Sequence, residues 1–145
     1  MAYWQELVQS VNSDCTFKPP AMEQVLAEIE EALGIAVPGP LLGLWRECNG
    51  IAQKYGEGIW SAEETIRENL ELRSYPEQND LYMSFDPLFC FAWAGNGDLF
   101  FLPIQAGGIH NPDIFLWSHE DDSRTWIAND LETFVIQWFG GRDFR

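Results

Sequence analysis

The fold of this chain is decided by residues 88–102, which read LFCFAWAGNGDLFFL. Two apolar runs, residues 88–93 and 99–102, flank a turn over residues 94–98 that contains two glycines. Short apolar runs joined by such a turn predict a β-hairpin. Neither run alternates apolar with polar residues. We therefore expect both faces of these strands to be buried, or one apolar face to be left open for binding.

The chain that follows predicts a second hairpin and a terminal helix. Residues 113–118 and 124–128 are expected to be strands, joined by a polar loop over residues 119–123. We expect Asn129 to cap the last helix, with Glu132 at the capping-box position.

The chain that precedes the first hairpin is mainly helical in pattern. Apolar residues at helical spacing predict helices over about residues 4–11, 22–33 and 41–48. Residues 51–60 predict one or two short strands around a turn. Ser61 and Glu64 form a capping box for a helix that is expected to end near Arg73, before a loop over residues 75–80.

The links between the predicted strands are too short to hold crossover helices, so the sheet is expected to be antiparallel. The predicted class is α+β, with a single, mainly antiparallel sheet of about four to six strands and helices packed against it. The 145 residues fit one domain. Residues 1–20 are expected to form an N-terminal helix and a lead-in.

The formal net charge is −15, and it is spread along the chain. Residues 1–50, 51–100 and 101–145 carry −5, −6 and −4. A nucleic-acid backbone and an anionic membrane surface are both repelled by such a field, so we expect neither as a partner. A basic protein is attracted, and its association is accelerated.

The second predicted helix has the most uneven charge. Its polar face carries Glu23, Glu28, Glu30 and Glu31 and no lysine or arginine. Glu28 and Glu31 are three residues apart, a spacing at which like charges destabilise a helix. The face is either a plain solvated surface or a surface kept acidic for a partner.

The three cysteines, Cys15, Cys48 and Cys90, form no CxxC motif, and two of them lie in apolar runs. This usage suits a reducing compartment better than a disulfide scaffold. The N-terminus lacks the basic and apolar regions of a signal peptide, and no apolar run is long enough to span a membrane. We expect a cytoplasmic protein.

No residue pattern predicts catalysis, a cofactor or a metal site. The two histidines, His110 and His119, lie in predicted loops, and Asp14 disfavours a thiolate at Cys15. The loop from His119 to Asp122 offers an imidazole and three carboxylates, which suit a hairpin turn, a partner contact or a cation. It has neither EF-hand nor HExxH spacing.

Tryptophan is abundant, with seven in the chain. Most are expected in the core, although one or two, such as Trp60 or Trp117, are candidates for exposed anchors. The predicted partner-binding residues are Glu23, Glu28, Glu30, Glu31, Glu57, Trp60, Asp98, Trp117, Glu120, Asp121 and Asp122.

The order of several short motifs resembles a known superfamily. An acidic helix ends at Leu33-Gly34, Val37-Pro38 follows, and the next helix ends at Asn49-Gly50. Residues 91–101 form a hairpin with a Gly-Asp turn, and residues 113–120 end in a Trp followed by a His–acid turn. This order, over about residues 20–140, resembles the SUKH superfamily of Smi/Knr-type cell-wall regulators and bacterial immunity proteins. Residues 55–82 match no pattern of that superfamily, and against its pattern the N-terminal helix and lead-in over residues 1–20 are an addition or a variable cap.

The resemblance implies an α+β fold, no catalysis and neutralisation of a cognate toxin by direct binding. Many such toxins are nucleases, whose phosphate-binding surfaces are basic. A basic nuclease-type toxin is thus the expected partner. A non-catalytic regulatory scaffold or adaptor that binds a protein or peptide is the alternative.

Overall fold

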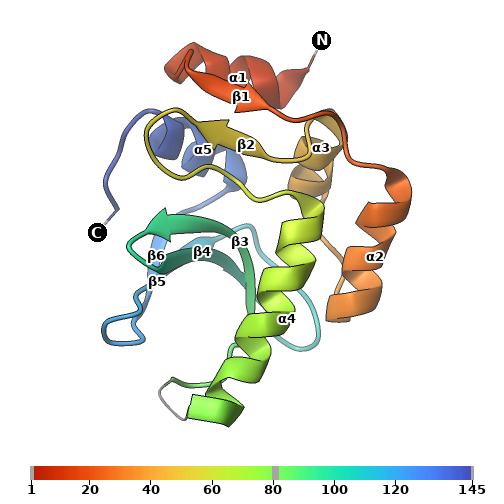
Figure 1. Ribbon diagram of the computed structural model, residues 1–145, viewed down its shortest axis with the longest axis vertical. Helices are drawn as coiled ribbons and strands as arrows, with labels where there is room; N and C mark the ends of the chain where they lie inside the picture. Colours follow the sequence, from red (N-terminus) through yellow and green to blue (C-terminus); the bar gives the residue numbers. More distant parts are fainter. Residues whose placement is uncertain (1, 80–81, 145) are drawn as a thin grey trace.

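The computed structural model describes residues 2–79 and 82–144. Along the chain its elements are α1 (Tyr3–Val11), β1 (Cys15–Phe17), α2 (Glu23–Leu33), α3 (Gly39–Glu47), β2 (Ile51–Gln53), α4 (Ala62–Asn79), β3 (Leu88–Gly95), β4 (Asp98–Pro103), β5 (Ile114–Trp117), β6 (Arg124–Ala128) and α5 (Leu131–Phe139). Figure 1 shows the helices arranged around the β3–β6 sheet. The predicted α+β class is confirmed.

The strands form two sheets and not one. Strands β3, β4, β5 and β6 pair in sequence order and are antiparallel throughout. Strand β1 pairs with β2 in a separate two-stranded ribbon, in which Thr16 lies opposite Ala52. Residues 1–20 were predicted to hold a helix and a lead-in with no strand, so β1 was not predicted. Both predicted hairpins are confirmed.

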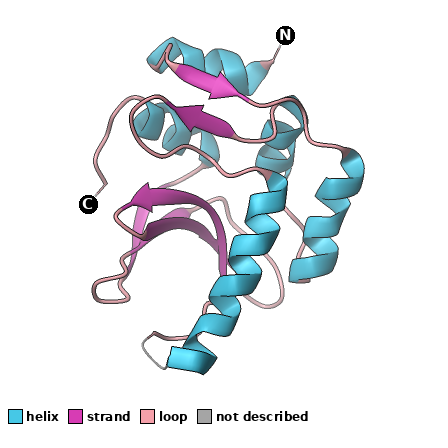
Figure 2. Ribbon diagram, in the orientation of Figure 1, coloured by secondary structure: helices cyan, strands magenta, loops and turns pink. Residues whose placement is uncertain are grey.

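The central hairpin is buried on both faces, which settles the alternative left open by its unbroken apolarity. One face contributes Phe89, Phe91 and Phe100 to the main core, beneath α1, α3 and α5. The other face contributes Cys90, Leu99 and Phe101 to a second apolar cluster that also contains residues from α4 and from the segment after it. Figure 2 shows the sheet below α5 and beside α4.

Helices α2 and α4 contact each other and run side by side along one flank of the molecule (Figures 1 and 2). The Arg73 Nη1 atom donates to the Leu33 carbonyl over 3.2 Å, which ties the C-terminal end of α2 to the second half of α4. Helix α4 is fixed to the sheet by Asn69, whose side chain is buried. Its amide accepts from the Cys90 N–H and donates to the Cys90 carbonyl, so it pairs with the edge of β3.

The N-terminus of α4 shows the predicted capping box. The Ser61 hydroxyl accepts from the Glu64 N–H, and the Glu64 carboxylate accepts from the Ser61 N–H, both over 3.1 Å. Asn49, just after α3, adds a further acceptor for the Ala62 N–H. The end of α3 and the start of α4 are therefore joined by side-chain hydrogen bonds.

The predicted end of α4 near Arg73 was wrong, since the helix continues to Asn79. The loop had been predicted because Pro76 lacks an N–H and usually ends a helix. Tertiary packing competes with that preference here: Tyr75 stacks on Tyr82 with ring centroids 5.9 Å apart. Asp80, the last residue of the predicted loop, lies outside the described residues.

The cap of α5 is Asp130 and not the predicted Asn129. The Asp130 carboxylate accepts from the Thr133 N–H over 2.7 Å, whereas Asn129 is exposed. Both residues are good cap types, so composition alone did not separate them.

We expect Asp130→Ala to lower the free energy of unfolding by about 1 kcal/mol, because the Thr133 N–H loses its acceptor. Asn129→Ala is the matched control and should change it by less than about 0.5 kcal/mol. Urea unfolding of both variants measures the difference. Equal losses in the two variants would contradict the assigned cap.

Candidate protein-binding surface

The loop between β5 and β6 is held in one shape by Asp122. Its carboxylate accepts from the Met83 N–H over 2.9 Å, from the Trp117 indole N–H over 2.6 Å and from Arg124 over 3.3 Å. Arg124 also donates to the backbone carbonyls of Met83 and Ser84. Asp122 has a left-handed φ of 59°, which aspartate tolerates better than most residues. These hydrogen bonds fix the conformation of the β5–β6 loop.

A second set of hydrogen bonds joins the β5–β6 loop to the turn between β3 and β4. The Asp98 carboxylate accepts from the backbone N–H of His119 over 3.1 Å and from its Nδ1–H over 2.7 Å. The Tyr82 hydroxyl donates to the His119 carbonyl. Asp98 is only 5% exposed, so its predicted place on the partner-facing surface was wrong. Sequence did not show that the neighbouring loop would fold over it.

The pKa of Asp122 lies below its ordinary value. Burial raises it, but the hydrogen bonds from Met83 and Trp117 and the charge of Arg124 outweigh burial. A carboxyl with a lowered folded pKa stabilises the fold above its unfolded pKa of about 3.9, and this contribution is lost as pH falls through the folded pKa.

We expect Asp122→Asn to lower the free energy of unfolding at pH 7, and the gap from wild type to shrink as the pH falls below about 4. Asparagine also tolerates the left-handed φ, so the substitution leaves the backbone unstrained and removes the charge together with one of the two acceptor oxygens. Urea unfolding over this pH range measures the gap. Asp86→Asn, at an exposed site, is the control. A gap that stays constant or widens in acid would contradict the assignment.

The two tryptophans named as candidate anchors are both buried. Trp60 and Trp117 are each 4% exposed, so neither forms an exposed anchor. Trp60 meets Trp93 edge to face, with centroids 5.4 Å apart, and its carbonyl accepts from the Trp45 indole. Trp117 packs edge to face on Tyr82 and Phe85. Their burial follows from α4 and residues 82–85 covering the outer face of the sheet.

The exposed tryptophan is Trp126, which was not among the predicted anchors. It lies on β6 opposite Phe115, which in turn lies opposite Phe101 on β4. This aromatic row passes from Phe101, 2% exposed, to Trp126, 53% exposed. The Trp126 indole donates to the Asp113 carboxylate over 3.1 Å, which fixes its orientation. Strand alternation alone could not show which end of the row is open.

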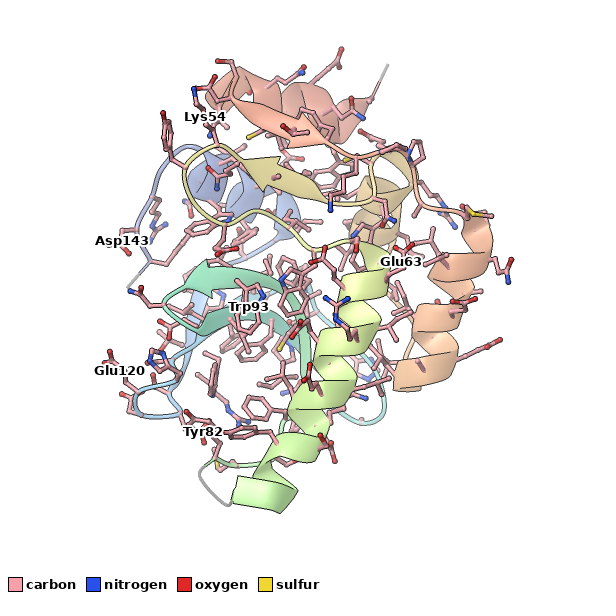
Figure 3. The ribbon with its side chains drawn as sticks, viewed as in Figure 1. Lys54, Glu63, Tyr82, Trp93, Glu120 and Asp143 are labelled. Atoms are coloured by element: carbon pink, nitrogen blue, oxygen red, sulfur yellow. The ribbon has the colours of Figure 1, made fainter. Side chains whose placement is uncertain are left out.

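Acidic residues lie at both ends of the β5–β6 hairpin that carries Trp126. We define the hairpin surface as Asp113, Phe115, Glu120, Asp121 and Trp126. Glu120 and Asp121 are exposed on the loop, and Figure 3 shows Glu120 at the outer margin of the molecule. The pKa of Asp121 is lowered by hydrogen bonds from Ser123, so it keeps its charge at neutral pH. These two predicted residues are accessible.

Residues 113–132 contain six carboxylates and one arginine, Arg124. The Arg124 side chain is 18% exposed and is directed toward Asp122 and the carbonyls of residues 83 and 84. It also lies over the Phe85 ring, with 5.9 Å to the centroid. The single basic side chain of residues 113–132 is therefore engaged within the protein and does not offset the charge of the exposed carboxylates.

The acidic face of α2 is partly neutralised by its neighbours. Arg46 of α3 pairs with Glu23 over 3.0 Å, and the Glu30 carboxylate accepts from the Val37 N–H. Glu28 and Glu31 are exposed, and neither forms an ion pair within residues 2–79 and 82–144. The adjacent α4 adds exposed Glu63 and Glu71, which were not among the predicted site residues because the α2–α4 contact was not predicted.

The remaining predicted residue, Glu57, is exposed in the segment between β2 and α4. It lines a pocket of about 200 Å³ together with Trp60, Glu64 and Trp93. Figure 3 shows Trp93 between the sheet and α4. The exposed predicted residues thus lie in three places: on α2, on the hairpin surface, and, for Glu57, at this pocket.

The cysteines show no activated thiol. Burial raises the pKa of Cys48 and of Cys90 to about 12, and burial together with Asp14 raises that of Cys15. The Cys thiols therefore stay protonated at neutral pH. Within the described residues, no group of three or more His, Cys, Asp or Glu is placed to hold a metal ion. No described helix is long and apolar enough to cross a membrane.

Comparisons with known proteins place these features in a wider context. A family model described as SUKH_6, SMI1-KNR4 cell-wall, matches residues 23–135. The match begins at α2 and ends within α5, so it includes both hairpins and both acidic surfaces. No curated protein matches the chain in sequence.

Proposed function

Because this chain belongs to the SUKH_6, SMI1-KNR4 cell-wall, family, we propose that it is a non-catalytic immunity protein that neutralises a cognate bacterial toxin domain. The superfamily includes bacterial immunity proteins as well as cell-wall regulators. In this proposal the protein acts in the cytoplasm, where its three free cysteines stay reduced. Its partner is a basic, nuclease-type toxin.

The observation that carries this proposal is the uncompensated acid of the hairpin surface. Glu120 and Asp121 are exposed, and the one arginine of the segment, Arg124, is turned inward. A surface that served only solubility would gain from mixed charges, since interspersed cations relieve repulsion. A surface that binds a basic partner gains instead from having no cations, because a cation would repel that partner.

The partner chemistry follows from the same charge. A nuclease holds a phosphate backbone through lysine and arginine, so its active surface is basic. An acidic protein that covers this surface blocks substrate access and is steered to it over long range. The net charge of −15 supplies the steering field. Exposed Trp126 supplies a large apolar contact of the kind found at the centre of interfaces.

Co-expression with a candidate toxin domain, taken from the genes that neighbour this one, tests the proposal. We expect the protein to protect cells from the active toxin and to co-purify with a catalytically inactive form of it. A Phe134→Ala variant, which removes a core side chain, is the control for protection that depends on the folded protein. Failure of the wild-type protein both to protect and to co-purify would contradict the proposal.

The adaptor function remains the second candidate, and the half-exposed aromatic row of Phe115 and Trp126 favours it. An adaptor that binds a peptide through apolar contacts should show affinity that depends weakly on salt. An immunity protein that binds through the acidic surfaces should lose affinity as salt rises. Affinity measured at low and high salt separates the two.

A further inference from the structure

Strand β6 is an open edge of the four-stranded sheet. The strand order ends at β6, and no described strand pairs with its other side. Arg124 is half-buried while Thr125 and Trp126 are exposed, so the start of this edge is accessible. At the opposite side of the sheet, the edge of β3 is covered by Asn69 and by the Trp60 N–H, which donates to the Phe91 carbonyl. The β3 edge is therefore covered, whereas the β6 edge is open.

The backbone groups that face outward from β6 can be assigned. The Ser118 N–H donates to the Ser123 carbonyl, so these residues form a hydrogen-bonded pair at the start of the ladder. Such pairs alternate along antiparallel strands, and Leu116 lies opposite Thr125 as the next one. Thr125 therefore bonds to β5. The N–H and C=O groups of Arg124 and Trp126 point away from the sheet.

We propose that this edge binds an extended, basic segment of the partner by strand addition, with Trp126 as the anchor. An added strand takes the free backbone groups of Arg124 and Trp126 as hydrogen-bond partners. Its alternate side chains extend the aromatic row of Phe101, Phe115 and Trp126. The proposal rests on the proposed function and names how the toxin is held.

Charge decides which segment fits. Asp113 lies at one end of the edge, and Glu120 and Asp121 lie on the loop at the other. A segment rich in lysine or arginine is attracted to both ends, and an acidic segment is repelled. The edge is also short, because a bulge between Ile114 and Phe115 interrupts the register after Trp126. This restricts pairing to a few residues and limits self-association of the edge.

Capped peptides of about eight residues that alternate valine with lysine or arginine are the probe. We expect them to bind, and to slow hydrogen exchange at the Arg124 and Trp126 amides about tenfold at saturation, with Thr125 unchanged. Peptides with glutamate in place of the basic residues should not bind. Trp126→Ala should weaken binding about tenfold. Tyr55→Ala, which removes an aromatic residue that is 80% exposed elsewhere, should leave it unchanged.

Backbone methylation tests strand addition directly. The amides of alternate peptide residues face β6, so N-methylation of one alternate set should abolish binding while methylation of the other should not. Equal binding of both methylated sets, protection at residues other than 124 and 126, or no binding of any basic peptide at about 1 mM would overturn the proposal. If the protein still protects cells from the toxin in those cases, the immunity function stands and only the docking mode falls.

Discussion

Replacing Asn69 with leucine is expected to lower the free energy of unfolding by about 2–6 kcal/mol. Asn69 is 1% exposed, and its side chain pairs with both backbone groups of Cys90, over 2.9 and 2.7 Å. Leucine has a similar volume but no polar atoms. The Cys90 N–H and C=O would remain buried without partners, and each such group costs about 1–3 kcal/mol.

Urea unfolding measures this loss. Gln24→Leu, which also removes a helix amide but at an exposed position on α2, is the matched control and should change stability by less than about 0.5 kcal/mol. A loss below about 1 kcal/mol in Asn69→Leu would mean that the edge of β3 finds other partners. Helix α4 would then not depend on this contact for its position.

Phe134→Ala is expected to cost about 3–5 kcal/mol, because it opens a cavity in the main core. Phe134 is fully buried on α5, and its ring meets those of Phe91 and Phe100 edge to face, with centroids 5.5 and 4.7 Å apart. The substitution therefore removes contacts on which both strands of the central hairpin depend.

Chemical unfolding of Phe134→Ala alongside Ile136→Ala makes the comparison within one helix. Ile136 is 38% exposed, so its loss should cost much less. Similar losses in the two variants would contradict the assigned inner face of α5. A Phe134→Ala protein that unfolds at room temperature would agree with the account, since few domains of this size have more than about 5–15 kcal/mol to lose.

The elements with local signals were predictable from sequence. Residues 88–102 carry their turn between two apolar runs, and Ser61 and Glu64 form their capping box within four residues of chain. Gly34 ends α2 in the left-handed conformation that glycine favours, with a φ of 72°. In each case the residues that decide the structure are neighbours in sequence.

The features that were missed depend on contacts between distant residues. Strand β1 has three residues, too few for a periodic pattern, and exists because it pairs with β2. Trp117 and Trp126 look alike in sequence, and only the segment over residues 82–85 makes one buried and leaves the other open. Asp98 is buried because it forms a hydrogen bond with His119, which comes from the other hairpin.

Several of the predicted site residues lie at the surface, as expected. Glu28, Glu31, Glu120 and Asp121 are exposed, as their sequence settings predicted. Asp122 differs from its neighbour because three donors from separate positions converge on its carboxylate. Sequence showed an acidic loop, and the fold divides its acids into one that holds the loop and others that face solvent.

The association rate with the toxin, measured against salt, tests most directly whether the acidic surfaces bind a basic partner. We expect the combined variant Glu28→Lys, Glu31→Lys and Glu120→Lys to associate about tenfold more slowly at low salt and with a flatter salt dependence. The three glutamine replacements should fall between this variant and wild type. Rates that are unchanged in both, with stability also unchanged, would mean that the acid serves solubility alone and would contradict the account.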